Sequence, residues 1–331
     1  MLSRLFVFSA ALIAACASVA PTAQAQDPRC SQPQFVGADE LGGDACQKVI
    51  DIYNYMNIQF GTLVAGGNAT LGRGGTLGGL GHFAVGLRAN AMATSIPNIE
   101  LTGISLGPVG APQSFVTNQY LVPFPVLDAA VGLFRGFPAG VSYIGGVDLL
   151  ASATVLPQFS QQSVSVATLD HAYDFGFGAR IGILQETFAT PGVSFTYFRR
   201  DLPKATVTAT ANQTDDVSVQ DYQMKTSAWR LVAGKSFTIV GVAAGIGQDK
   251  YDGNARLTYD VQGVTPTDTL TLRTKPTRTS AFLDLSLNVA LLKIVGEAGH
   301  VWGGSVSTYN TFDPVANEAR WYWSLGLRLG L

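Results

Sequence analysis

The sequence is poor in charge and has no long hydrophobic run after its first 25 residues. Lys, Arg, Asp and Glu together make up 13% of the 331 residues, and the formal net charge is −2. No basic patch or arm is present, which argues against nucleic acid as a partner because phosphate binding needs concentrated positive charge. No later segment approaches the roughly 20 consecutive apolar residues of a transmembrane helix. The chain is nevertheless 47% hydrophobic, so its apolar residues must be distributed in some other pattern.

Cysteine is also scarce, with three residues in the whole chain. A positively charged start, an apolar stretch and the small-residue site "AQA" predict a signal peptide over residues 1–25. The alternative is lipid attachment at Cys16, within "IAAC". Cleavage after residue 25 leaves Cys30 and Cys46, and an even pair in an exported chain predicts one disulfide. The alternative for this pair is two free thiols.

Apolar and polar residues alternate with a period of two in ten segments, which is the signature of β-strands. The last segment, "ARWYWSLGLRLGL", places two Trp and four Leu residues on one face and Arg328 with two glycines on the other. Glycine is abundant (37 residues) and falls in these segments, where it would weaken a soluble strand. A membrane barrel explains both features, because apolar residues face lipid while glycine and polar residues face the interior. The segments are 82–92, 126–134, 141–150, 171–183, 193–200, 228–234, 240–247, 282–289, 294–302 and 319–331.

The connections between these segments alternate between short and long. Bacterial outer-membrane barrels have short periplasmic turns and longer extracellular loops, and an even strand number places both ends of the barrel on one side. The sequence therefore predicts an all-β fold, a transmembrane antiparallel up-and-down β-barrel over residues 82–331. About ten strands are expected, with 12–14 as the alternative, and both chain termini are expected in the periplasm.

With its signal peptide, alternating strands and closing aromatic-apolar strand, the chain resembles the Gram-negative outer-membrane β-barrel superfamily. This resemblance implies location in the outer membrane, with membrane lipid as a partner. The last strand resembles the recognition signal for the barrel assembly machinery, which usually ends in an aromatic residue, whereas this chain ends in Leu331. Trp321 and Trp323 are expected in an aromatic girdle at the membrane boundary.

Residues 26–81 precede the predicted barrel and follow a different pattern. A helix is expected from Asp44, as the N-cap, to about Phe60, and a glycine-rich segment follows over 61–81. The apolar stripe of this helix needs a cover, so we expect residues 44–81 to lie in the lumen or at its mouth as a plug. The alternative is a periplasmic linker whose stripe binds a partner. The segment resembles the N-terminal hatch of long-chain fatty-acid transporters. The stripe consists of Val49, Ile52, Tyr53, Met56 and Phe60.

The alternation also predicts which charged side chains face the interior. They could form a paired ion network that fills the barrel, or they could line a charged pore or polar binding site. Because about eight strands are just filled by their own side chains, ten strands favour the first interpretation. The predicted lumenal network consists of Arg88, Asp128, Asp148, Asp174, Arg180, Arg200, Arg230, Asp284, Glu297 and Arg328.

No catalytic residue, metal site or cofactor is expected. The three histidines, His82, His171 and His300, fall on different segments, and Asp170 and Asp174 lie on the opposite face from His171 in a regular strand. The leading hypothesis is passage of a small solute across the outer membrane, with hydrophobic solutes favoured because the lumen is narrow. The alternatives are a structural or partner-binding barrel without transport and, third, an outer-membrane hydrolase. The sequence does not identify the solute.

Overall fold

The computed structural model describes residues 25–330 except 99–102, 157, 162–163 and 212–214. The predicted signal peptide therefore lies outside the described residues except for residue 25, as do Cys16 and Leu331. Among the described helices, none is both long and apolar enough to cross a membrane.

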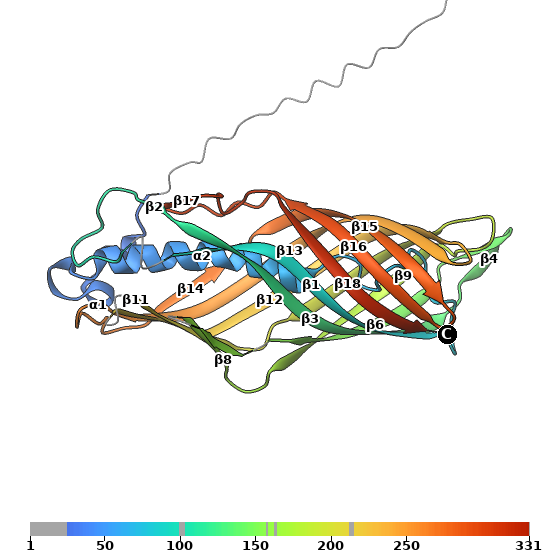
Figure 1. Cartoon of the computed structure of the whole chain (residues 1–331), viewed down its shortest axis with the longest axis horizontal. Helices are drawn as coiled ribbons and strands as arrows, with labels where there is room; N and C mark the ends of the chain where they lie inside the picture. The colour runs from blue at the N-terminus through green and yellow to red at the C-terminus, as the bar shows by residue number, and fades with distance from the viewer. Residues whose placement is uncertain (1–24, 99–102, 157, 162–163, 212–214, 331) are drawn as a thin grey trace, which may run out of the picture.

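Ten antiparallel strands close into one barrel, which confirms the predicted fold and strand number (Figure 1). Each strand pairs with its neighbours in sequence, β12 pairs with β13, and the last strand pairs with the first, so no edge is left open. Closure satisfies every strand's backbone groups, as a membrane requires. The barrel strands are β1 (Phe83–Pro97), β3 (Thr117–Phe134), β6 (Val147–Val155), β9 (Tyr173–Leu184), β10 (Gly192–Asp201), β12 (Asp215–Ser236), β13 (Val240–Asp260), β15 (Thr277–Val289), β16 (Leu292–Trp302) and β18 (Arg320–Gly330).

The connections are sorted by length between the two ends of the barrel. We call the end with the long connections the loop end, and the end with the short connections and the C-terminus the turn end (Figure 1). Additional short strands extend or brace these connections. They are β2 (Ser114–Phe115), β4 (Phe137–Ala139), β5 (Ser142–Ile144), β7 (Phe159–Gln161), β8 (Val164–Thr168), β11 (Ala205–Ala211), β14 (Leu270–Thr274) and β17 (Thr311–Phe312).

Several strands are longer than the alternation predicted, because they continue past the membrane. The predicted segments 228–234 and 240–247 are parts of β12 and β13. The connections between strands are therefore shorter than the predicted 201–227 and 248–280, because β12 begins at Asp215 and β13 continues to Asp260. Along the whole of β13 every second residue faces inward, but the apolar residues change from the outward face to the inward face. Near the turn end, Val242 and Ile246 point outward, whereas beyond residue 248 the buried inward residues include Tyr251, Leu257 and Tyr259.

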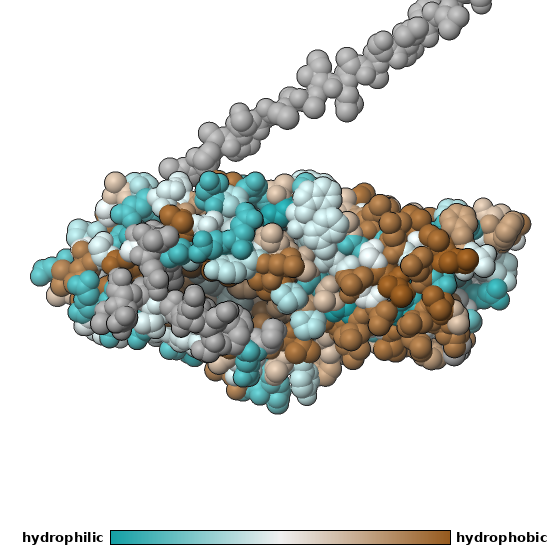
Figure 2. Space-filling model, viewed as in Figure 1, coloured by the Kyte–Doolittle hydropathy of each residue, from teal (hydrophilic) through white to brown (hydrophobic). Residues whose placement is uncertain are grey.

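The inversion divides the barrel into two halves. Figure 2 shows apolar surface gathered around the half that carries β4 and the C-terminus, while the other half is largely hydrophilic. The turn-end half therefore matches a membrane-spanning barrel, and the loop-end half projects into water with an apolar interior. The apolar belt around the turn-end half includes Val85, Leu87, Leu127, Val131, Ile181, Leu231, Ile246, Leu285, Ile294, Leu325 and Leu327, and Phe177 also faces outward.

A long helix, α2 (Gly43–Ala65), fills the loop-end half (Figure 1). It is longer than the predicted helix, and its N-cap is Gly42 rather than Asp44. Asp44 lies in the first turn, where its carboxylate accepts hydrogen bonds from Ser105 and pairs with Lys48 at 2.9 Å. Three short helices precede it at the loop end: η1 (Pro28–Ser31), α1 (Pro33–Val36) and η2 (Ala38–Glu40).

The position of these short helices contradicts one sequence expectation. Both ends of the barrel itself, the start of β1 and the end of β18, lie at the turn end, as predicted. Residues 25–42, however, lie at the loop end, because the chain runs through the barrel before it enters β1. The expectation that both ends of the chain lie on the same side is therefore wrong for the described residues, because residues 25–42 lie at the opposite end of the barrel from the C-terminus.

The belt predicts the effect of a charge at Leu327. This side chain faces outward between Leu87 and Ile294 on the neighbouring strands. Leu327→Arg should lower the free energy of unfolding in lipid by about 2–4 kcal/mol, whereas Leu327→Ile should have little effect. Heat-modifiable gel migration along a urea gradient measures both. Equal stability of the two variants would mean that the strand faces the other way.

Candidate functional site: a plug inside the barrel

The candidate site is the barrel lumen and the segment that occupies it, which we call the plug (residues 43–79). In α2, nineteen of 23 residues are buried, including polar residues on the side opposite the apolar stripe. Val49 and Tyr53 belong to one core with wall residues such as Tyr251, while Ile52 and Met56 pack on a second cluster around Phe115. The barrel wall therefore covers the apolar stripe, and the segment occupies the lumen rather than the periplasm.

Four wall arginines hold the point where the helix ends, and we call this group the arginine cradle: Arg88, Arg200, Arg230 and Arg328. Arg200 donates to the carbonyl of Ala65, the last helical residue. Arg230 donates to the carbonyls of Gly66 (2.8 Å) and Gly67 (3.3 Å). We call the rest of the plug, residues 66–79, the coil. Further along it, Arg88 donates to Asn68 O at 2.7 Å and Arg328 donates to Leu71 O.

The cradle has a clear physical cause. The last four carbonyl groups of a helix have no partner within the helix, and the helix dipole makes this end negative. Inside a barrel these groups are cut off from water, so the wall must supply the donors. Asn90 contributes one more, donating to the carbonyl of Leu63 at 3.1 Å. Positive side chains at this position thus satisfy both the hydrogen bonds and the dipole.

Two arginines of the cradle, and Arg180 in the neighbouring wall, are paired with wall carboxylates. Asp128 lies between Arg88 (2.9 Å) and Arg200 (3.3 Å), and Asp148 pairs with Arg180 at 2.7 Å. All five side chains are buried. Buried charges are tolerated only when they are paired and hydrogen-bonded, so the arrangement is that of a filling network rather than an open charged surface.

The sequence missed the partner of Arg230. Asp249 pairs with Arg230 at 2.6 Å and is fully buried, but the alternation had assigned it to a connection. Its parity in β13 matches the inward residues before it, so extending the period of two past Gly247 would have found it. Asp174, by contrast, lies on the predicted face but near the loop end. It is half-buried, and its carboxylate accepts a hydrogen bond from the backbone amide of its neighbour Phe175 at 2.7 Å.

Asp284 and Glu297 face each other across β15 and β16 and bind the start of the coil. Asn68 donates from its side chain to Asp284 (2.6 Å) and from its backbone to Glu297 (2.8 Å), and Gly72 N donates to Asp284 at 2.9 Å. A side chain at position 67 would displace the Glu297 carboxylate, which here accepts the hydrogen bond from Asn68 N.

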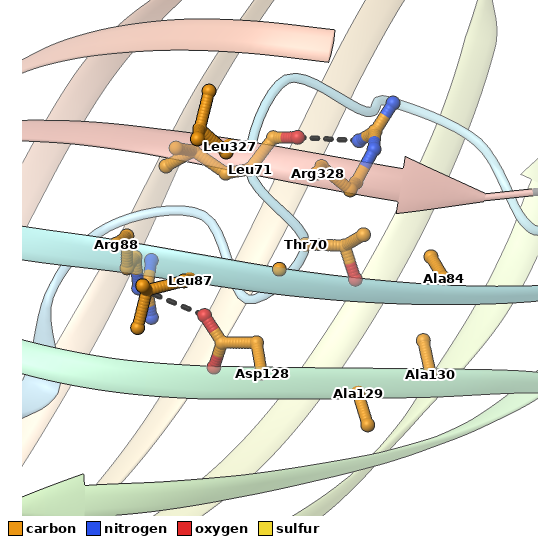
Figure 3. A pocket seen from close by; sticks show the side chains of 11 residues that line it. Thr70, Leu71, Ala84, Leu87, Arg88, Asp128, Ala129, Ala130, Leu327 and Arg328 are labelled. Carbon is orange, nitrogen blue, oxygen red and sulfur yellow. Dashed lines mark hydrogen bonds and ion pairs between the residues drawn. The ribbon is translucent and has the colours of Figure 1, made fainter. Parts of the chain in front are cut away.

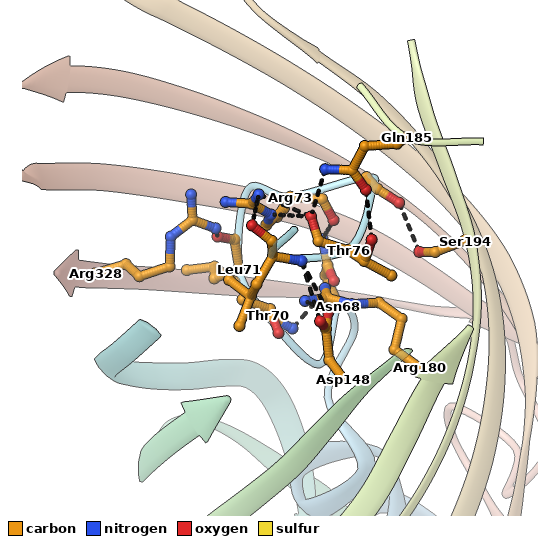
Figure 4. Close-up of polar contacts among 12 residues, drawn as sticks. Asn68, Thr70, Leu71, Arg73, Thr76, Asp148, Arg180, Gln185, Ser194 and Arg328 are labelled. Atoms are coloured by element: carbon orange, nitrogen blue, oxygen red, sulfur yellow. Dashed lines mark hydrogen bonds and ion pairs between the residues drawn. The ribbon is translucent and has the colours of Figure 1, made fainter. Parts of the chain in front are cut away.

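The lower part of the coil is bound to the wall in the same way (Figure 4). Leu77 N donates to both oxygens of Asp148, at 3.1 and 3.0 Å, and Ser194 donates to the carbonyl of Gly74 at 2.5 Å. Thr76 is hydrogen-bonded to Gln185. Arg73 folds back to the carbonyl of Thr76 at 2.8 Å, which tightens the coil into a loop.

Glycine allows the coil to approach the wall closely. A side chain on Gly74 would strike the backbone of Gly234 in β12. A small cavity of about 20 Å³ remains between the coil and strands β1, β3 and β18 (Figure 3). Arg88, Asp128 and Arg328 contribute to its lining. This volume suits a single water molecule and is too small for an organic solute.

The upper end of α2 is tied to the long connections. Asp51 accepts hydrogen bonds from Tyr309 N (3.0 Å) and from both Asn310 N (2.9 Å) and its side chain (2.8 Å). Burial raises the pKa of the Asp51 carboxyl, and these hydrogen bonds oppose the shift. Cys30 and Cys46 form a disulfide that joins η1 to the first turns of α2.

Near the start of the described chain, Asp27 pairs with Arg29 at 2.7 Å. The hydrogen bond from this guanidinium lowers the pKa of the Asp27 carboxyl. The same carboxylate accepts a hydrogen bond from Arg29 N at 3.0 Å and thereby caps η1.

Trp321 and Trp323 lie at the loop-end start of β18 and are exposed on the outside. Their rings are stacked at 6.3 Å, and Trp321 also contacts His300. His171 stacks on Tyr173, and His82 lies beside Gly79 at the turn end, so the three histidines are dispersed. Over the described ranges, no group of three or more His, Cys, Asp or Glu residues is arranged to hold a metal ion.

The buried pair of Arg180 and Asp148 yields a stability prediction. Arg180→Met leaves Asp148 buried without its cation and should cost about 3–5 kcal/mol of unfolding free energy. Adding Asp148→Asn removes the stranded charge but keeps an acceptor for Leu77 N, so the double variant should be more stable than the single one. Urea titration of the refolded barrels measures both. A double variant no more stable than Arg180→Met would contradict this pairing.

No protein-family model and no curated protein matches the sequence. Among solved structures, the chain is similar to Ail, the attachment invasion locus protein of Yersinia pestis, at 9% identity and a TM-score of 0.30 over 76% of this chain and 99% of that chain. It is also similar to the Pseudomonas putida toluene transporter TodX, at 12% identity and a TM-score of 0.36 over 75% and 88% of the two chains. Neisserial surface protein A shows 10% identity and a TM-score of 0.28 over 75% and 96%.

These scores are too low to carry an argument about activity, so the assignment rests on the chain's own geometry. The barrel has no open edge, its apolar belt is confined to one half, and its connections are sorted by length between its two ends. These are the properties of a Gram-negative outer-membrane β-barrel.

Proposed function

We propose that the chain is an outer-membrane barrel that stays closed and acts at its outer face, as a structural or partner-binding protein. The observation that carries this proposal is the packing of α2. The helix is tightly packed, because its apolar side chains form two hydrophobic clusters with the wall and connections of the loop-end half. Those fully or nearly fully buried in the helix are Val49, Ile50, Tyr53, Tyr55, Ile58, Leu63 and Val64.

The magnitude of this packing argues against free passage of a solute. Each such side chain contributes about 1.5–3 kcal/mol on burial, so expelling the helix into water would cost on the order of 10 kcal/mol or more. Since about 1.4 kcal/mol corresponds to a factor of ten, an open barrel would be populated on the order of once in 10⁷ molecules. Expelling the helix would also break the hydrogen bonds of the arginine cradle, so the open barrel would be rarer still. Passage, the leading hypothesis from the sequence, would require a trigger that removes the helix.

A partner-binding role is supported by the construction of the loop end. There, the strands continue past the belt, the short strands β2 and β17 pair, and the connections around Val109, Thr271 and Tyr309 contact the N-terminal segment. Such bracing gives the outer face a fixed shape, which is what recognition by a partner requires.

A cross-link between plug and wall tests the proposal. A Cβ atom at position 182 would lie 3.0 Å from Cγ2 of Thr76, so Thr76→Cys with Gly182→Cys should form a disulfide on oxidation. In proteoliposomes, the double variant should pass small solutes no faster than empty vesicles, whether oxidised or reduced. The single variant Thr76→Cys is the matched control for the substitution, and deletion of residues 30–78 tests whether an unplugged barrel conducts.

Two outcomes separate the hypotheses. Absence of flux in both redox states, with the cross-link verified by mass spectrometry, supports a closed barrel. Flux through the reduced double variant that disappears on oxidation would show that the plug moves, and would restore solute passage as the function.

A further inference from the structure

The direction in which the chain runs through the barrel has a consequence for its N-terminal segment. Gln26 lies at the loop end, where its side-chain amide donates to the hydroxyl of Tyr309 at 3.3 Å and to Val109 O at 3.4 Å. Both partners belong to long connections between barrel strands. The segment is therefore placed among the loops themselves.

Further contacts fix residues 25–42 in this place. The backbone amides of Thr267 and Asp268 donate to the carbonyl of Gln34, at 2.9 and 3.0 Å. The hydroxyl of Tyr259 donates to Phe35 O (2.5 Å) and Gly42 O (3.0 Å). Arg29 donates to Thr271 O at 2.8 Å. The segment is thus bonded to the connection between β13 and β15 at several points.

From there the chain descends steadily through the lumen, as its contacts with β13 and β12 show. Gly42 is bonded to Tyr259, Asn57 lies against Gly253, and Thr62 is within 3.2 Å of the Tyr251 hydroxyl.

The descent continues through the membrane half. Gly66 is bonded to Arg230, and Gly74 lies against Gly234 near the end of β12. β1 then begins at the turn end, so the chain crosses the whole barrel once before its first strand.

In outer-membrane barrels the long loops face outward and the short turns face the periplasm. We propose that this barrel carries its own N-terminal segment across the outer membrane and displays it, from residue 26 onward, at the cell surface. A barrel preceded by a periplasmic linker would leave the same segment on the inner side. The proposal also makes the plug a transmembrane connection, because residues 43–79 join a surface segment to a barrel that starts in the periplasm.

Thiol labelling on intact cells tests the proposal with two matched positions. Ala38 is exposed within the N-terminal segment, and Phe188 is fully exposed on the short connection between β9 and β10. Ala38→Cys and Phe188→Cys are each expressed in the full chain and treated with a membrane-impermeant maleimide. The cells are labelled with and without permeabilisation of the outer membrane. Heat-modifiable migration confirms that each barrel has folded.

We expect Ala38→Cys to be labelled equally in intact and permeabilised cells, and Phe188→Cys only after permeabilisation. Labelling of Ala38→Cys only after permeabilisation would overturn the proposal. Because a new thiol could exchange with Cys30 or Cys46, an epitope inserted directly before Gln26 provides a second measurement. Antibody binding to intact cells supports display at the surface, and binding that requires permeabilisation contradicts it.

Discussion

The hydrogen bonds between the arginine cradle and the end of α2 are the interaction on which the lumen depends. A helix that ends inside a barrel leaves carbonyl groups that neither the helix nor water can satisfy. Arg200 and Arg230 supply the missing donors, and the carboxylates of Asp128 and Asp249 pair with their charge. The cradle lies where the apolar core of the loop-end half meets the charged interior of the membrane half. It therefore joins two environments that would otherwise be incompatible within one barrel.

These two environments explain why one chain carries two kinds of alternation. In the membrane half, lipid requires apolar residues outside, and the narrow interior is filled by paired charges and a glycine-rich coil. In the loop-end half, water surrounds the barrel and the helix provides an apolar centre, so the wall presents Tyr251 and Leu257 inward. The parity of the strand is preserved, because the pleat continues without interruption. Only the solvent on each face changes.

Much of the fold could be predicted from the sequence because the period of two is a local property. Closure, strand number and the inward phase of Arg88, Arg180 and Arg328 all follow from it. The true lengths of β12 and β13 could not be predicted by searching for apolar outward residues, since beyond the membrane the outward residues are polar. For this reason the sequence analysis did not include Asp249 among the inward-facing charged residues.

The course of the plug could be predicted only in part. The apolar stripe of the helix indicated that it needed a cover, and glycine indicated close packing of the coil. The direction of the helix depends on contacts between residues far apart in sequence, such as Asp51 with Asn310 and Tyr259 with Gly42. No local pattern contains that information, so the sequence did not predict that residues 25–42 lie at the opposite end of the barrel from the C-terminus.

Hydrogen exchange of the purified full-length barrel tests the central claim most directly, because it reports whether α2 is enclosed without depending on any variant. If the helix is packed in the lumen and its end is held by the cradle, the amides of residues 46–65 should exchange as slowly as those of the central barrel strands. Exchange of these amides at the rate of an unprotected helix, in a barrel whose strands remain protected, would contradict the account.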